Sequence, residues 1–290
     1  KEASLALAND SRIAPGLISM MRSGHGETQL FGAKALCNIS TIQGSGNEML
    51  KPSSKKNAVT DFVVIALLRV NNDEIKEICS KAFFNLMTVA ETRQRMLDER
   101  VLWALIKLSK IDSEEYQETK RVCANTIFNL SCNDRTQQVL MEIGAVHVIA
   151  DLAKFDCNQS RRHCAGALMK LSFRRGEEAK MVEEGAIAAA QDLSLMDDAE
   201  SKWNCATVMF NLSCHKGSRQ KMVHDKAVNA LVNLSQCDDV ETSKLCVASL
   251  CNLSENREGH SHMVADGAVK ALINYLTIAM KNKGSEATAA

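Results

Sequence analysis

Cysteine is the residue whose number and spacing in this sequence could most readily do chemistry. The 290 residues include 11 cysteines, and five of these recur at intervals of 44, 41, 41 and 41 residues. Thiolates bind zinc, and thiols pair in disulfides. Equivalent positions of packed helices, however, lie roughly 8–10 Å apart, too far for a disulfide or for one shared zinc ion. We therefore expect small buried core residues at Cys79, Cys123, Cys164, Cys205 and Cys246.

The seven histidines form no recognisable catalytic or metal-binding motif. His163 and Cys164 are neighbours in the sequence, but adjacent residues of a helix point about 100° apart. They would therefore neither share a metal ion nor act as a nucleophile and its base. GxSxG, HExxH, P-loop and GxGxxG motifs are absent from the sequence. We expect a protein that is not an enzyme and that needs no metal and no cofactor.

Amide side chains recur in a phrase that the sequence repeats. TIFNLSCN at 126–133, VMFNLSCH at 208–215 and SLCNLSEN at 249–256 are nearly the same octamer. The anchor position of this phrase is Asn38, Asn85, Asn129, Lys170, Asn211 and Asn252, at intervals of 47, 44, 41, 41 and 41 residues. Asparagine is a poor former of helix interiors. Either each amide bonds the backbone of a neighbouring repeat and holds the stack, or it binds another chain; both can hold at once.

A second pattern with the same period shows which elements position these side chains. GAVHVIADL, GAIAAAQDL, KAVNALVNL and GAVKALINYL begin at residues 144, 185, 226 and 267, each 41 residues after the last. Each unit fits three helices: a short one such as 135–143, a Gly or Lys turn, a second amphipathic helix, and a third that carries the anchor. No helix of this length buries its apolar stripe alone, so the units must stack.

The two phrases together resemble the armadillo repeat. FNLSC is similar to the repeats of the beta-catenin, vacuolar-scaffold and U-box proteins. The nuclear-import branch has a Trp four residues before the anchor, and none stands there in this chain. The resemblance implies an all-α, right-handed superhelical solenoid of about six to seven three-helix repeats. It also implies that the third helices line a concave groove, where the anchor Asn holds an extended peptide.

The register of the repeat defines the expected domain organisation. Residues 1–290 form one domain with approximate repeats at 1–41, 42–88, 89–132, 133–173, 174–214, 215–255 and a partial 256–290. A polar insertion at 40–61 is expected to be a surface loop. Both ends fall within a repeat, so we expect an array that is truncated at each end.

Basic residues flank the anchors and suggest the charge of a partner. Lys34 and Lys81 stand four residues before their anchors, and eight residues before theirs stand Arg121, Arg162, Trp203 and Lys244. With Lys170 they would make a basic groove that favours acidic segments, with Trp203 as an anchor pocket. The alternative is that these are ordinary surface charges whose stems cover apolar surface.

Composition limits the remaining possibilities. Lys and Arg total 35, and Asp and Glu total 35, which does not favour nucleic acid as a partner. No apolar run reaches the roughly 18 residues of a membrane span, and the cysteines, which lack a CxxC pair, favour a reducing compartment. We therefore expect a cytoplasmic scaffold, possibly also nuclear or cilium-associated, with protein partners and no membrane insertion. The alternatives are the substrate-recruiting array of a larger ubiquitin ligase and a structural element of an assembly such as an axoneme.

Overall fold

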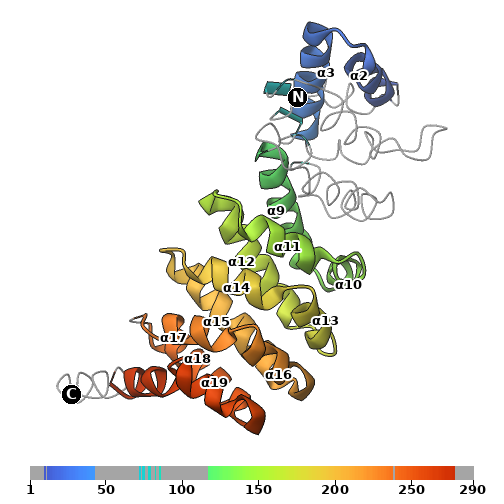
Figure 1. The fold of residues 1–290 in the computed structure, drawn as a ribbon. Helices are drawn as coiled ribbons and strands as arrows, with labels where there is room; N and C mark the ends of the chain where they lie inside the picture. Colours follow the sequence, from blue (N-terminus) through green and yellow to red (C-terminus); the bar gives the residue numbers. More distant parts are fainter. Residues whose placement is uncertain are drawn as a thin grey trace, which may run out of the picture. The chain divides into compact units, whose positions relative to one another are not determined.

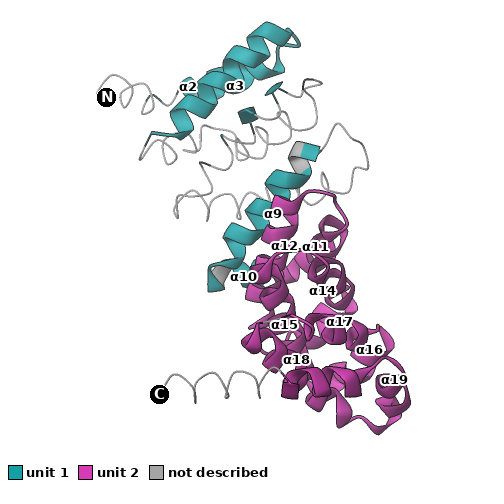
Figure 2. Ribbon diagram, turned by 90° about the vertical axis from the view of Figure 1, so that its left-hand side faces the viewer, with its two compact units in different colours: residues 1–139 teal, residues 140–290 magenta. Residues whose placement is uncertain are grey.

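The computed structural model describes residues 10, 12–42, 72, 74, 75, 78, 79, 82, 85, 117–237 and 239–277. The chain divides into two compact units, Lys1–Val139 and Leu140–Ala290 (Figure 2). Each is considered by itself. The insertion expected at 40–61 lies outside the described residues apart from 40–42.

The first unit contains three described helices and the start of a fourth. They are α2 (Ile13–Arg22), α3 (Gly26–Ser40), α9 (Gln117–Ser131) and α10 (Asp134–Glu142), the last of which extends past the division. Helices α2 and α3 pack against each other. Gly32 lies at this contact, where a Cβ atom would meet Met21 Cγ at 3.1 Å and Leu17 O at 3.3 Å. This close approach explains why glycine stands in the slot that later repeats fill with cysteine.

The second unit repeats the same order of helices (Figure 1). The second helices are α11 (Ala145–Ala153), α14 (Ala186–Ser194) and α17 (Ala227–Leu234). The third helices are α12 (Asn158–Ser172), α15 (Ala199–Cys214) and α18 (Val240–Ser254). The first helices are α13 (Glu178–Glu183), α16 (Lys216–His224) and α19 (His260–Ala265), with a 3-10 turn η3 (Arg257–Gly259) before α19. Residues 268–277 are also helical. The predicted three-helix unit is confirmed.

Equivalent helices of successive repeats pack on one another. Helix α12 contacts α15, and α15 contacts α18; the second helices α11, α14 and α17 form a parallel series. The apolar residues that face these contacts are almost fully buried, as at Ile187, Leu193 and Leu212. This burial supplies the main favourable contribution to folding, and it keeps the third helices side by side.

The turn between the first and second helices is built on a left-handed residue. Gly144, Gly185 and Gly267 have φ angles of 74°, 94° and 89°. Lys226 occupies the same place with φ 62°, and it is the one residue other than glycine with positive φ in the described part of the chain. The predicted turn is therefore confirmed, and Lys226 carries a conformational cost that glycine does not.

Two of the third helices begin with an aspartate cap. Asp198 accepts hydrogen bonds from the backbone and side chain of Ser201, and Asp239 does the same with Thr242. The hydroxyl hydrogen bond is the main cause that lowers the pKa of each aspartate below its ordinary value. These caps fix where α15 and α18 begin, and hence which residues reach the anchor position. Within the described residues, no helix is both long and apolar enough to cross a membrane.

Candidate functional site

The anchor residues of the second unit lie near the ends of three adjacent helices. Lys170 is on α12, Asn211 on α15 and Asn252 on α18, and all three are partly exposed. Because α12, α15 and α18 pack side by side, these residues form successive rungs along one face. We call this set, with the residues that flank it on the same helices, the anchor face.

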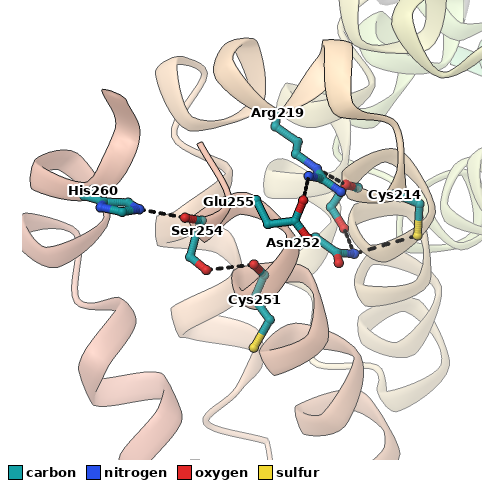
Figure 3. A network of polar contacts seen from close by, with 8 residues as sticks. Cys214, Arg219, Cys251, Asn252, Ser254, Glu255 and His260 are labelled. Carbon is teal, nitrogen blue, oxygen red and sulfur yellow. Dashed lines mark hydrogen bonds and ion pairs between the residues drawn. The ribbon is translucent and has the colours of Figure 1, made fainter. Parts of the chain in front are cut away.

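Each anchor asparagine donates a hydrogen bond to the serine of the preceding phrase. Asn211 Nδ2 donates to Ser172 Oγ at 2.9 Å, and Asn252 Nδ2 donates to Ser213 Oγ at 3.0 Å (Figure 3). Each serine hydroxyl donates in turn to the carbonyl three residues earlier in its own helix, at 2.7 Å. The Asn and Ser of the repeated phrase are therefore the two halves of one contact between repeats.

The first unit contains the same contact once. Asn85 Nδ2 donates to Ser40 Oγ at 3.0 Å. Asn129 instead donates to Asn125 Oδ1, one turn earlier in α9, at 3.3 Å. Asn38 is exposed near the end of α3. The amides thus hold the stack, but through a serine hydroxyl and not through the neighbouring backbone as the sequence had suggested.

This arrangement leaves part of each amide for another partner. Within the described residues, Oδ1 of Asn211 and Oδ1 of Asn252 accept no hydrogen bond. Asn211 also keeps one N–H of its amide, whereas Asn252 Nδ2 has a second contact with Cys214 Sγ at 3.7 Å. An acceptor and a donor on one planar group match a peptide group of another chain.

The basic residues of the expected groove are mostly paired with carboxylates. Arg162 Nε lies 3.3 Å from Asp198 Oδ1, and Lys244 Nζ lies 3.6 Å from Glu241 Oε2. In the first unit, Lys34 Nζ lies 3.2 Å from Glu74 Oε1. Arg121 is exposed on α9, and Lys81 lies outside the described residues. The sequence missed these pairs because the Arg162 partner belongs to the following repeat.

Lys170 differs from the other basic residues of the anchor face. It stands in the asparagine column, and it forms no ion pair with any residue that the structure describes. Two exposed aromatic side chains belong to the same pair of helices: Trp203 on α15 is 38% exposed, and Phe173, at the end of α12, is 59% exposed. Sequence reasoning singled out Trp203 but missed Phe173, whose signal is an apolar residue three positions after the anchor.

A further polar contact between helices was not recognised from the sequence. Gln137 Nε2, Arg219 Nε and His260 Nε2 bond the carbonyl oxygens of Ser131, Ser213 and Ser254 at 2.7, 2.8 and 2.6 Å (Figure 3). Each donor lies eight residues after its anchor, and each acceptor is the last residue or the penultimate residue of a third helix. The side chain therefore caps the negative end of that helix. We call this contact the carbonyl clamp.

The clamp has one strong member and one exception. Arg219 is buried, and its Nη1 also contacts Glu255 Oε2 at 2.5 Å. At the equivalent position after α12 stands Glu178, whose carboxylate instead accepts from the Gly176 N–H at 2.7 Å. No described residue donates to Ser172 O. Helix α12 thus ends without the clamp that α15 and α18 have.

The recurring cysteines are core residues, as predicted. All five are at most 2% exposed, and no disulfide joins any of the eleven cysteines, which are all described. Burial raises the pKa of Cys79 and Cys205 to about 12 and also raises the pKa of Cys246. Burial likewise lowers the pKa of His163. In the described part of the chain, no group of His, Cys, Asp and Glu could hold a metal ion. The described thiols of this column are therefore placed for packing.

Comparison with known proteins identifies the fold. No protein-family model and no curated protein matches the chain. Among solved structures, computationally designed armadillo repeat proteins for modular peptide recognition match with a TM-score of 0.65 and 20% identity, over 82% of this chain and 98% of theirs. The chain has the armadillo fold.

Two further armadillo structures show the range of the likeness. A designed armadillo protein in complex with the peptide (KR)4 matches with a TM-score of 0.61 and 21% identity, over 82% of this chain and 98% of that one. A structure from work on the interaction between cadherin and beta-catenin matches with a TM-score of 0.67 and 13% identity. It covers 95% of this chain and 53% of the other. The armadillo resemblance drawn from the repeated phrases is confirmed at the level of the fold.

Proposed function

We propose that the chain is a non-catalytic scaffold that binds an extended, acidic peptide segment along its anchor face. The observation that carries this proposal is the half-used amide of Asn211 and Asn252. One side of each amide is bonded to the preceding repeat, and its Oδ1 has no partner among the described residues. Fixing the amide in this way lowers the entropy that binding would cost.

The spacing of the rungs suits an extended chain. Packed helices lie roughly 8–10 Å apart, and two residues of an extended strand span about 7 Å. A peptide that crosses α12, α15 and α18 would present a peptide group at each rung. Designed armadillo proteins of the same fold are built for modular peptide recognition, which supports this use of the third helices.

Lys170 gives the proposed preference for acidic segments. It is the anchor-face cation without an ion pair among the described residues, while Arg162 and Lys244 are already partly neutralised by carboxylates. We therefore assign the preference to one rung and not to the whole basic strip. An acidic residue of the peptide would lie opposite Lys170, with an apolar neighbour against Phe173 or Trp203.

The test needs a variant that separates peptide binding from stacking, and the Asn211–Ser172 bond offers one. Asn211→Ala removes both the stacking bond and the free amide, whereas Ser172→Ala removes the stacking bond alone. Peptides would first be selected on the wild-type protein from a random 12-residue phage library. Their affinities for each variant would then be measured by fluorescence anisotropy at low salt, after circular dichroism has shown equal folding.

We expect Asn211→Ala to weaken the selected peptides by about three- to tenfold, since a hydrogen bond contributes about 0.5–1.5 kcal/mol. Ser172→Ala should leave their affinity nearly unchanged. Lys170→Asn restores the amide of the column and removes the charge, so it should weaken acidic peptides by roughly two- to fivefold and leave neutral peptides unaffected. Equal losses for Asn211→Ala and Ser172→Ala would mean that the column only holds the stack. Selection of basic peptides would refute the charge preference.

A further inference from the structure

The last described helix of the second unit exposes an apolar face at the end of the stack. The exposed fractions are 63% for Val264, 52% for Val269, 37% for Leu272, 58% for Ile273 and 54% for Leu276. Large exposed apolar patches of this kind mark interaction surfaces. The face lies on α19 and on the helix at 268–277, apart from the anchor face.

The same positions are buried in the preceding repeat. Forty-one residues earlier stand Val223, Val228, Leu231, Val232 and Ser235, with exposed fractions of 6%, 0%, 0%, 7% and 0%. The register that relates the two sets is the one that relates the left-handed turns at Lys226 and Gly267. The difference is therefore one of cover and not of residue type.

The missing cover can be identified by elimination. Elements that precede the second helix, such as α14 and α15 for α17, have described counterparts for the helix at 268–277. The elements that cover α17 from the other side are its own third helix α18 and the repeat that follows. Gly267 approaches Val232, for example, with a virtual Cβ at 3.7 Å, and Gly259 approaches Val223 at 3.3 Å. At 268–277 it is this following side that has no described counterpart.

We propose that this end face binds an amphipathic helix of the third-helix kind, as the first element of one further repeat. The three third helices of the unit define its chemistry. Each buries a cysteine, then Leu or Met four residues later, then Leu seven residues later: Cys164, Leu168 and Leu171 in α12, Cys205, Met209 and Leu212 in α15, and Cys246, Leu250 and Leu253 in α18. The interface would continue the packing that already joins α17 to α18.

A tethered copy of α18 tests the fit. Residues 280–290 would be replaced by a copy of Asp239–Gly259, which keeps the 41-residue register and brings its own aspartate cap and the turn η3. Val269→Cys provides a local reporter, read as the rate of labelling by iodoacetamide in tryptic peptides. The control carries the same graft with the copies of Leu250 and Leu253 changed to Asp. Labelling of buried Cys205 reports in every sample that the unit is folded.

We expect the graft to slow labelling at position 269 by at least about tenfold, as burial does elsewhere in a folded unit, and the Asp-bearing graft to leave it fast. Equal rates with both grafts would overturn the proposal. Slow labelling in the ungrafted protein that becomes fast on dilution would also overturn it, because a second copy of the chain would then cover the face. This test concerns the end face alone, and its failure would leave the proposed peptide binding untouched.

Discussion

Replacing Arg219 separates the two bonds of the strongest carbonyl clamp. Its side chain is buried between the ends of two third helices, with Nε 2.8 Å from Ser213 O and Nη1 2.5 Å from Glu255 Oε2 (Figure 3). Arg219→Leu keeps an apolar stem of similar reach but removes both bonds. Arg219→Gln can keep the carbonyl bond, because Gln137 makes the equivalent bond to Ser131 O at 2.7 Å. The chain thus supplies its own conservative replacement.

The size of each effect follows from burial. Ser213 is fully buried, and a buried carbonyl left without a donor costs about 1–3 kcal/mol. The ion pair contributes less, because Glu255 is 59% exposed, and pairs in contact with solvent contribute about 0.2–1 kcal/mol. We therefore expect Arg219→Leu to lower the free energy of unfolding by about 2–3 kcal/mol, and Arg219→Gln by no more than about 1 kcal/mol.

Urea unfolding followed by circular dichroism measures both losses, with the slope compared among variants because repeat arrays can lose cooperativity. Glu255→Gln is the matched control: it removes the ion pair alone, and its loss should equal that of Arg219→Gln. Combining it with Arg219→Gln should add nothing further. Equal losses for the Leu and Gln variants would refute the reasoning, since the bond to Ser213 O would then contribute nothing to stability.

Three other substitutions or measurements test the repeat in the same way. Glu178→Gln should raise the free energy of unfolding by about 0.5–1.5 kcal/mol by donating to Ser172 O; urea unfolding that shows no gain would contradict the clamp rule. Lys226→Gly should stabilise by about 0.5–1 kcal/mol because φ is positive there, and a lower urea midpoint would show that the lysine stem packs usefully. At pH 8, iodoacetamide should modify exposed Cys214 quickly and spare Cys205, whose pKa burial raises to about 12, until urea unfolds the protein; rapid native labelling of Cys205 would contradict its burial.

The order of the helices could be predicted from the sequence because two independent phrases share one period. The left-handed turns followed for the same reason, and Lys226 was placed correctly among the glycines. These features depend on residues that are close in the sequence. Stacking of the repeats was then required, since no single unit can bury its own apolar stripe.

The contacts between repeats were harder to predict because they join residues about 40 positions apart. The serine that receives Asn211 stands 39 residues earlier, and the phrase itself does not say which of its polar residues meet. The carbonyl clamp was missed because Gln137, Arg219 and His260 share a function, the donation of a hydrogen bond, but no chemical type. The basic strip was overestimated for a related reason: Asp198 pairs with Arg162 from the next repeat.

Helix α12 departs from both rules at once. It carries Lys170 where its neighbours carry asparagine, and Glu178 stands where its clamp donor should be. Phe173 is exposed beside these positions. Sequences that break a local rule usually do so where function requires it. Two adjacent departures at one helix end are therefore better explained by a partner at this rung than by two unrelated losses of stability.

That interpretation makes the Glu178→Gln variant informative beyond its stability. If the open end of α12 serves the peptide, the added clamp should stabilise the fold and also weaken the selected acidic peptides, because Ser172 O and the nearby backbone would no longer be available to them. If the open end has no role, stability should rise and peptide affinity should stay the same. Measuring both quantities on this one variant decides whether α12 exchanges stability for recognition.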